Sequence, residues 1–174
     1  TDPENNGAVK GFAKIDFDDS AWQMLRTDRP WEEQGFDGYN GSAWYRMAVD
    51  IPAGCKDRAT VIIGAADEAA EVWINGKKLL DRPYPYKGNL NSYAESFEVS
   101  WDPVPGRNVI AVKVIDNNGV GGITKPCYIK FEKRISRKEN LVKDSTFTAA
   151  KSPWQFYKRN GISKFSRTKI DGQN

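Results

Sequence analysis

The feature that most constrains the fold of this chain is a series of short apolar segments separated by turn residues. Residues 43–51 alternate strictly, and one face of that segment carries Tyr45, Met47, Val49 and Ile51. Successive side chains of a strand point to opposite faces of a sheet, so this pattern predicts a half-buried strand. Asn75-Gly76 divides residues 69–81 into a hairpin, because a two-residue turn needs positive φ at both positions. The chain is therefore predicted to be an all-β sandwich or barrel.

Further strands are expected at residues 58–66, 92–102, 107–116 and 126–135. In the third of these segments the expected core residues are Ile110, Val112 and Val114, whereas Lys113 on the opposite face indicates partial exposure. One short helix is expected at residues 16–25, with Asp18, Asp19 or Ser20 as its N-cap.

Composition excludes several kinds of chemistry. The 174 residues include no His, which removes the usual general base, the usual zinc ligand and a Ser-His-Asp triad. Cys55 and Cys127 form no CxxC pair, and we expect unpaired thiols, with a disulfide as the alternative. No apolar run approaches the about 20 residues of a membrane span.

Charge and composition change near residue 136. From Phe131 onward the chain has 11 Lys and Arg against 4 Asp and Glu, spread among Ser, Thr and Asn. This spacing favours a solvated segment over a nucleic-acid interface. We therefore expect one domain over residues 1–135, followed by a linker and the start of a second, incomplete β module over residues 136–174.

Four motifs occur in an order that resembles a known family: DFDDSAWQML, PWEEQGFDGYNGSAWYRMAVDIP, AAEVWINGKKL and PGRNVIAVKVIDNNGVGGI. Over roughly residues 10–130 the chain resembles the N-terminal sugar-binding domain of glycoside hydrolase family 2, which has a galactose-binding-like jelly-roll fold. Residues 140–157 resemble the opening of a second carbohydrate-binding jelly roll. The resemblance implies a jelly-roll β-sandwich in a larger polysaccharide-degrading enzyme that is secreted or periplasmic.

Three loops carry the residues suited to binding a sugar, namely 31–42, 83–93 and 116–122. Flat rings can cover the C–H face of a sugar, and amides or carboxylates can pair with its hydroxyls. The candidate sugar-binding residues are Trp31, Asp37, Tyr39, Asn40, Tyr84, Tyr86, Asn91, Asp116 and Asn117. The resemblance implies that Asn40 faces the sugar, and that the first and third loops lie at one end, facing a catalytic barrel.

Structural roles remain open for the same residues. Trp31 can instead plug the end of the sandwich, Tyr84 and Tyr86 can pack their own loop, and the Asn and Asp of the third loop can be turn residues. Trp44 and Tyr45 are expected to pack the sheet. Gly121-Gly122 is expected to let backbone approach backbone where a loop folds over the sandwich end.

The leading hypothesis is a non-catalytic carbohydrate-binding module, whose partners are an oligo- or polysaccharide and the catalytic domain of the parent enzyme. The alternative is an accessory domain that docks on a catalytic barrel without binding sugar. Catalysis is not expected, because the adjacent Glu32 and Glu33 point opposite ways if extended, and Asp67 and Glu68 are expected to be solvated in a turn. No cofactor is expected, although the resemblance leaves a structural calcium ion open, with no ligands assigned.

Overall fold

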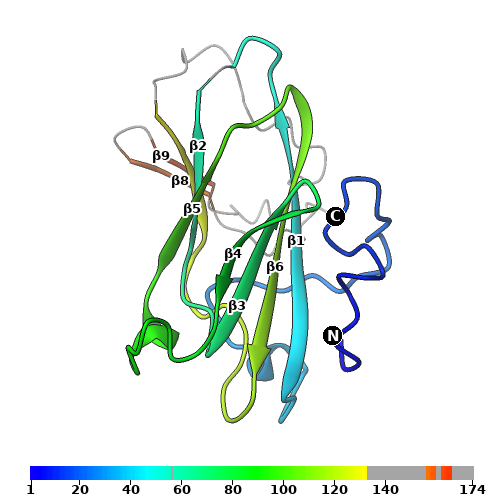
Figure 1. Ribbon diagram of the computed structural model, residues 1–174, viewed down its shortest axis with the longest axis vertical. Helices are drawn as coiled ribbons and strands as arrows, with labels where there is room; N and C mark the ends of the chain where they lie inside the picture. Colours follow the sequence, from blue (N-terminus) through cyan, green and yellow to red (C-terminus); the bar gives the residue numbers. More distant parts are fainter. Residues whose placement is uncertain (56, 133–155, 160–161, 166–174) are drawn as a thin grey trace, which may run out of the picture.

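The computed structural model describes residues 1–55, 57–132, 156–159 and 162–165, and it has two antiparallel sheets packed face to face (Figure 1). The four-stranded sheet has the order β1 (Gly41–Ile51), β6 (Gly106–Asp116), β3 (Ala69–Ile74) and β4 (Lys77–Arg82). The five-stranded sheet has the order β5 (Phe97–Trp101), β2 (Ala59–Ile63), β7 (Tyr128–Phe131), β9 (Ile162–Phe165) and β8 (Phe156–Arg159). Two short 3-10 turns, η1 (Glu32–Gln34) and η2 (Ser92–Ala94), lie in the connections. The prediction of an all-β sandwich is confirmed.

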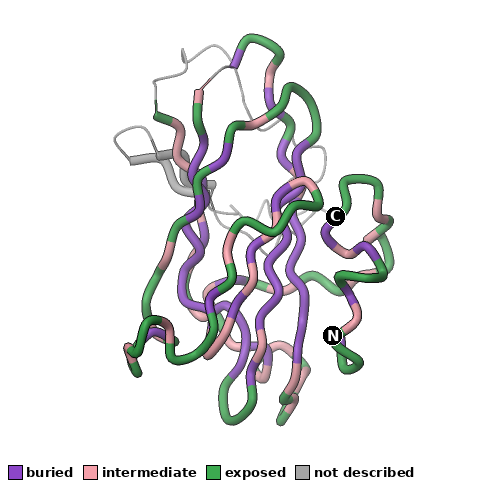
Figure 2. Tube along the Cα trace, in the orientation of Figure 1, coloured by how far each residue is buried: buried purple, intermediate pink, exposed green. Residues whose placement is uncertain are grey.

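The hydrophobic core lies between the two sheets, where the strands of both are buried along most of their length (Figure 2). The predicted core face of β1 is confirmed, because Tyr45, Met47, Val49 and Ile51 all belong to this core. The predicted core face of β6 is buried as well. Asn75 and Gly76 have φ values of 52° and 82°, so the hairpin between β3 and β4 turns as predicted.

The outer face of the four-stranded sheet is covered by the N-terminal segment, residues 1–22, which lies beside β1 (Figure 1). Ala13 and Trp44 form a second buried cluster with Ala111 of β6, so the expected packing role of Trp44 is confirmed. The guanidinium of Arg46 lies under this segment, 2.8 Å from the Asp19 carboxylate, and also donates to main-chain carbonyls of the segment.

Two expectations for this face were wrong. Residues 16–25 form turns rather than a helix, because their side chains and carbonyls are committed to the sheet beneath. Lys113 is 6% exposed rather than partly exposed, and its Nζ lies 3.4 Å from the Glu71 carboxylate, which offsets the cost of its burial.

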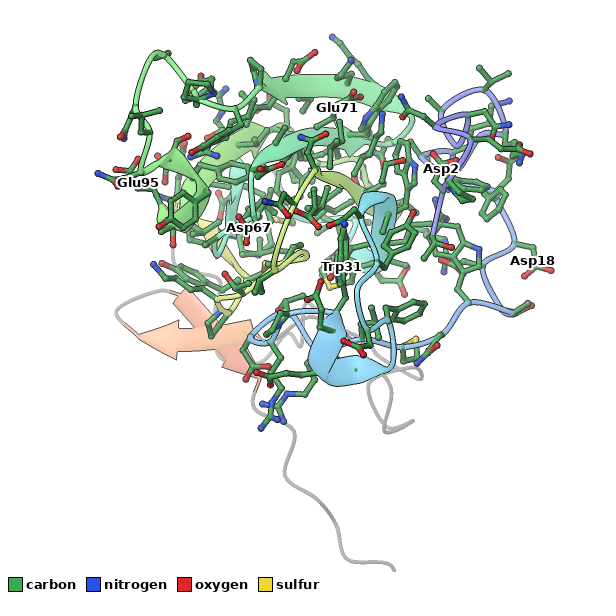
Figure 3. All side chains as sticks on the ribbon, turned by 90° about the horizontal axis from the view of Figure 1, so that it is seen from below. Asp2, Asp18, Trp31, Asp67, Glu71 and Glu95 are labelled. Atoms are coloured by element: carbon green, nitrogen blue, oxygen red, sulfur yellow. The ribbon has the colours of Figure 1, made fainter. Side chains whose placement is uncertain are left out.

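All three candidate loops lie at one end of the sandwich. Gly41 at the start of β1 pairs with Asp116 at the end of β6, which brings the first and third loops together as expected. Ala69 pairs with Ile115 and Ala70 pairs with Arg82, so the loop that follows β4 begins at the same end. We call this the loop end, and Figure 3 looks onto it.

The C-terminal part is described only in short pieces. β9 pairs with β7 through Ile129 and Ser163, so β8 and β9 extend the five-stranded sheet. The boundary at residues 135 and 136, and most of the segment 140–157, lie outside the described residues. The predicted division into two domains therefore stays a prediction.

Cys55 and Cys127 are both buried free thiols, in agreement with the expectation of unpaired cysteines. Burial raises the pKa of the Cys127 thiol to about 12. Within the described part of the chain, no helix has the length and apolar character needed to cross a membrane.

Candidate functional site

Trp31 closes the loop end over the core. Its ring is 1% exposed, and its Nε1 donates to the Tyr39 carbonyl at 3.1 Å. Its main-chain N–H donates to the Gly121 carbonyl at 3.1 Å, which joins the first loop to the third. Gly121 must be glycine here, because a Cβ would lie 2.0 Å from the Trp31 ring. The ring therefore plugs the sandwich, and the expected role of Gly121-Gly122 is confirmed.

The other candidates of the first loop lie around this plug. Tyr39 packs its ring against Trp31 with centroids 5.3 Å apart, and its hydroxyl donates to the Ser42 carbonyl at 2.7 Å. Partial burial raises the pKa of Tyr39 above its ordinary value. Asp37 and Asn40 are exposed beside it. Tyr39 is thus engaged in holding the loop, whereas Asp37 and Asn40 face solvent.

The candidates of the third loop tie it to the connection between β2 and β3. Asp116 is 1% exposed, and its Oδ1 accepts the Asn118 main-chain N–H at 3.1 Å. Asn117 donates its main-chain and side-chain N–H groups to Glu68 Oε2 at 2.6 and 2.7 Å. These are turn contacts, the structural alternative that the sequence left open.

The same connection holds carboxylates that sequence reasoning passed over. Asp67 and Glu68 are half-buried, so the expectation that both are solvated was wrong. Burial and the charge of Asp116 raise the pKa of Asp67 to about 6. Glu32 accepts the Gly121 N–H at 3.1 Å, so four carboxylates surround the third loop: Glu32, Asp67, Glu68 and Asp116. Asp67 and Trp31 both lie near the middle of this end in Figure 3.

Sequence could not have revealed this acidic cluster, because its members come from three separate connections. The nearest signal is Gly121-Gly122, which predicted close packing but not its partners. Among residues 1–55 and 57–132, no three Asp, Glu or Cys side chains are grouped so that they could hold a metal ion.

The second loop differs from the other two. Tyr84 and Tyr93 are 38% and 42% exposed, and their ring centroids lie 6.4 Å apart at an interplanar angle of 71°. The Tyr84 hydroxyl donates to the Leu90 carbonyl at 3.1 Å, which holds that ring in place. Asn91 is exposed between them, with its main-chain N–H bonded to Asn89 Oδ1 at 2.9 Å. Tyr93 was not among the predicted site residues, although it follows Asn91 by two positions.

A buried cation supports this loop from beneath. Arg82 at the end of β4 lies against the rings of Tyr86 and Phe97, with its guanidinium carbon 5.2 and 4.7 Å from their centroids. It donates to the Ser92 carbonyl, and the Ser92 hydroxyl in turn accepts the Tyr86 N–H at 3.0 Å. The half-buried Tyr86 is therefore part of the support, whereas Tyr84 and Tyr93 are its exposed surface.

A pocket of about 270 Å³ lies between the N-terminal segment and the first loop. Its walls are largely aromatic: Phe12, Trp22, Trp31, Phe36, Trp44 and Tyr45. The ring N–H of Trp44 is already bonded to Asp2 at 2.9 Å, and that of Trp31 to Tyr39. The pocket thus presents ring carbon more than free hydrogen-bonding groups, which suits a sugar poorly.

Comparison with solved structures identifies the class of this fold. A glycoside hydrolase family 2 member from Bacteroides cellulosilyticus matches with a TM-score of 0.52 and 21% identity, covering 66% of this chain and 17% of that one. A β-glycosidase from Bacteroides vulgatus matches with a TM-score of 0.51 and 25% identity, covering 70% and 18%. The chain has the antiparallel β-sandwich fold of a domain that glycoside hydrolase family 2 enzymes contain.

Among curated proteins, the chain is similar to a "Putative beta-glucuronidase" of Formosa agariphila. The two are 31% identical over 122 residues, which covers 63% of this chain and 11% of that protein. The chain therefore spans about a tenth of the length of this relative. No protein-family model matches the chain.

Proposed function

We propose that this chain is a non-catalytic accessory domain of a larger glycosidase, and that it contacts carbohydrate through the exposed tyrosines of its second loop. The single observation that carries the proposal is the pair Tyr84 and Tyr93, whose rings stay exposed on a loop that is otherwise internally bonded. The small share of the relatives' length that the chain covers supports an accessory role.

The second loop combines the group types that a sugar needs. Two rings supply flat apolar area, and preorganised rings lose little entropy on binding. The Asn91 amide can both donate to and accept from neighbouring hydroxyls. Lys87, exposed beside the Tyr86 ring at 5.2 Å, adds a positive charge that would favour an acidic sugar. A uronic acid glycoside is therefore the first ligand to test, in line with the name of the Formosa relative.

The test is titration of the chain with methyl β-D-glucuronide, methyl β-D-galactoside and oligosaccharides of both types, followed by calorimetry and NMR. We expect binding that Tyr84→Ala weakens about tenfold, the equivalent of one stacking contact. Tyr84→Phe is the matched control, because it keeps the ring and removes only the bond to Leu90. Absence of binding across the panel, or equal binding by both variants, would refute carbohydrate contact at this loop.

A second candidate function is docking on the catalytic domain of a parent enzyme through the first and third loops. It is favoured by the contacts between Trp31 and Gly121, which hold these loops in one shape before any partner arrives. Val120 is 49% exposed at the tip of the third loop, which makes it the natural contact residue. Val120→Asp is then expected to release the domain from the parent enzyme without loss of stability.

A secreted or periplasmic location belongs to the same proposal, because a polysaccharide meets its binding domain outside the cytoplasm. Expression of the parent protein followed by fractionation of the cells tests this directly.

A further inference from the structure

Two connections are tied together over the open end of the core. The first joins β2 to β3 through residues 64–68, and the second joins β6 to β7 through residues 117–127. Asp67 donates its main-chain N–H to the Gly122 carbonyl at 3.0 Å, and Thr124 donates to the Ala65 carbonyl at 2.8 Å. An isolated bridge pairs Ala66 with Ile123. The two connections thus behave as a clasp above the sandwich.

Asp116 lies at the base of this clasp with an unsatisfied acceptor. It is 1% exposed, and its Oδ2 is buried with no hydrogen-bond partner. Buried polar atoms are nearly always paired, so this oxygen needs either a donor or a positive charge.

The groups that face Asp67 and Asp116 do not supply that charge. Glu32 of η1 and Glu68 of the β2–β3 connection are carboxylates, and both act on the pair by repulsion. The hydroxyl of Tyr45 on β1 accepts the Ile123 N–H at 3.3 Å, and burial raises the pKa of that phenol. Within the described ranges, no three carboxylate or thiol groups form a metal-ligand set.

A proton meets both needs. A protonated carboxyl is a donor as well as an acceptor, and its protonation removes one of the four charges. Burial raises the pKa of Asp116, and burial together with the Asp116 charge raises that of Asp67 to about 6. Such interacting groups share their protons, so the titration belongs to the pair.

We propose that Asp67 and Asp116 form a proton-operated latch, in which one proton on this pair holds the β2–β3 and β6–β7 connections together. Loss of the proton leaves four mutually repelling carboxylates, and the third loop then loosens from the connection beneath it. Because that loop belongs to the rim of the loop end, acidification tightens the rim. The latch does not depend on whether the chain binds carbohydrate.

The sign of the effect on stability follows from linkage. The folded protein holds the proton up to about pH 6, whereas an unfolded Asp releases it near its model value of 3.8. The latch therefore stabilises the fold fully below about pH 4, and its contribution falls as pH rises towards 6. Above that pH both states are ionised and the contribution is lost.

The first test uses the unaltered chain, so no variant can fail to fold. Carbon-13 NMR of the carboxyl groups is expected to show a titration of the pair with a midpoint near pH 6. The amide proton of Asp67, which bonds to the Gly122 carbonyl, should shift with the same midpoint. Ordinary midpoints near pH 4 for both carboxyls would overturn the proposal, as would an Asp67 amide that does not respond.

The second test compares Asp67→Asn with Asp37→Asn, a control that removes an exposed carboxylate from the first loop. Thermal unfolding is followed from pH 4 to pH 8. The melting temperature of Asp67→Asn relative to the unaltered chain should rise by about 3 °C between pH 4 and pH 6 and then stay constant. The control should show no such rise, and a constant difference for Asp67→Asn would exclude the latch.

Discussion

The first and third loops and the second loop have similar compositions but opposite structures. All of them combine aromatic residues with Asn, Asp and Gly, and all lie at one end of the sandwich. In the first and third loops, Trp31 and Asp116 are buried and bonded within the loop end. In the second loop, Tyr84 and Tyr93 remain exposed.

The difference comes from what lies beneath each loop. The first and third loops cross the open end of the core, where an apolar surface must be covered, and Trp31 provides that cover. The second loop joins the edge strands β4 and β5, where the half-buried gap is already filled by Arg82 and the rings on either side of it. Its own tyrosines are therefore not needed for packing, and they are free to face a ligand.

The largest test of this comparison is Trp31→Ala. Removing a fully buried Trp from the sandwich end should reduce the free energy of unfolding by about 3–5 kcal/mol. Gly121→Ala should act on the same contact from the other side, since its Cβ would meet the Trp31 ring. Urea denaturation measures both. A loss below about 1 kcal/mol for Trp31→Ala would show that the loop end does not depend on this plug.

Arg82→Ala is expected to have the next largest effect. The change removes a charged hydrogen bond to the Ser92 carbonyl and contacts with two rings, and should cost about 2 kcal/mol. Arg107→Ala, at an exposed position of β6, is the matched control and should stay within about 0.5 kcal/mol. NMR should also show that residues 83–93 lose their order. If the loop keeps its order, its support comes from elsewhere.

Tyr45→Phe is expected to cost less, about 1 kcal/mol, because it removes only the acceptor of the Ile123 N–H. The ring still fills the core, so the fold should be retained. Tyr39→Phe is the comparison variant, since it removes a hydroxyl from a half-buried position in the first loop. Hydrogen exchange of the Ile123 amide separates the two, because only Tyr45→Phe should accelerate it.

Much of the fold could be predicted because it depends on local patterns. The alternation of residues 43–51 identified the core face of β1, and Asn75-Gly76 identified the hairpin, since both signals lie within a few consecutive residues. The cover formed by residues 1–22 could not be predicted in the same way. It has no periodic pattern, and it depends on carbonyls that meet Arg46 from about thirty positions away.

The site divides along the same line. Composition could identify which loops carry rings and amides, but not which rings the core would require. Trp31 and Tyr84 look equivalent in sequence, each next to a proline in a polar loop. Only the positions of the sheets decide that one covers the core and the other does not. The acidic cluster is likewise a long-range feature, because Asp67 and Asp116 meet through strand pairing.

The smallest expected effect on stability, and the sharpest test of the comparison, is that of Tyr84→Ala. Its ring is exposed and its hydroxyl bonds only within its own loop, so the free energy of unfolding should change by less than about 0.5 kcal/mol. The same change should remove the binding of a glycan probe, so that function is lost while stability is kept. Trp31→Ala should do the reverse at a temperature where it remains folded, because its ring is not available to a ligand. If Tyr84→Ala destabilised the chain as much as Arg82→Ala, the second loop would be a packing element like the others, and the contrast between the loops would disappear.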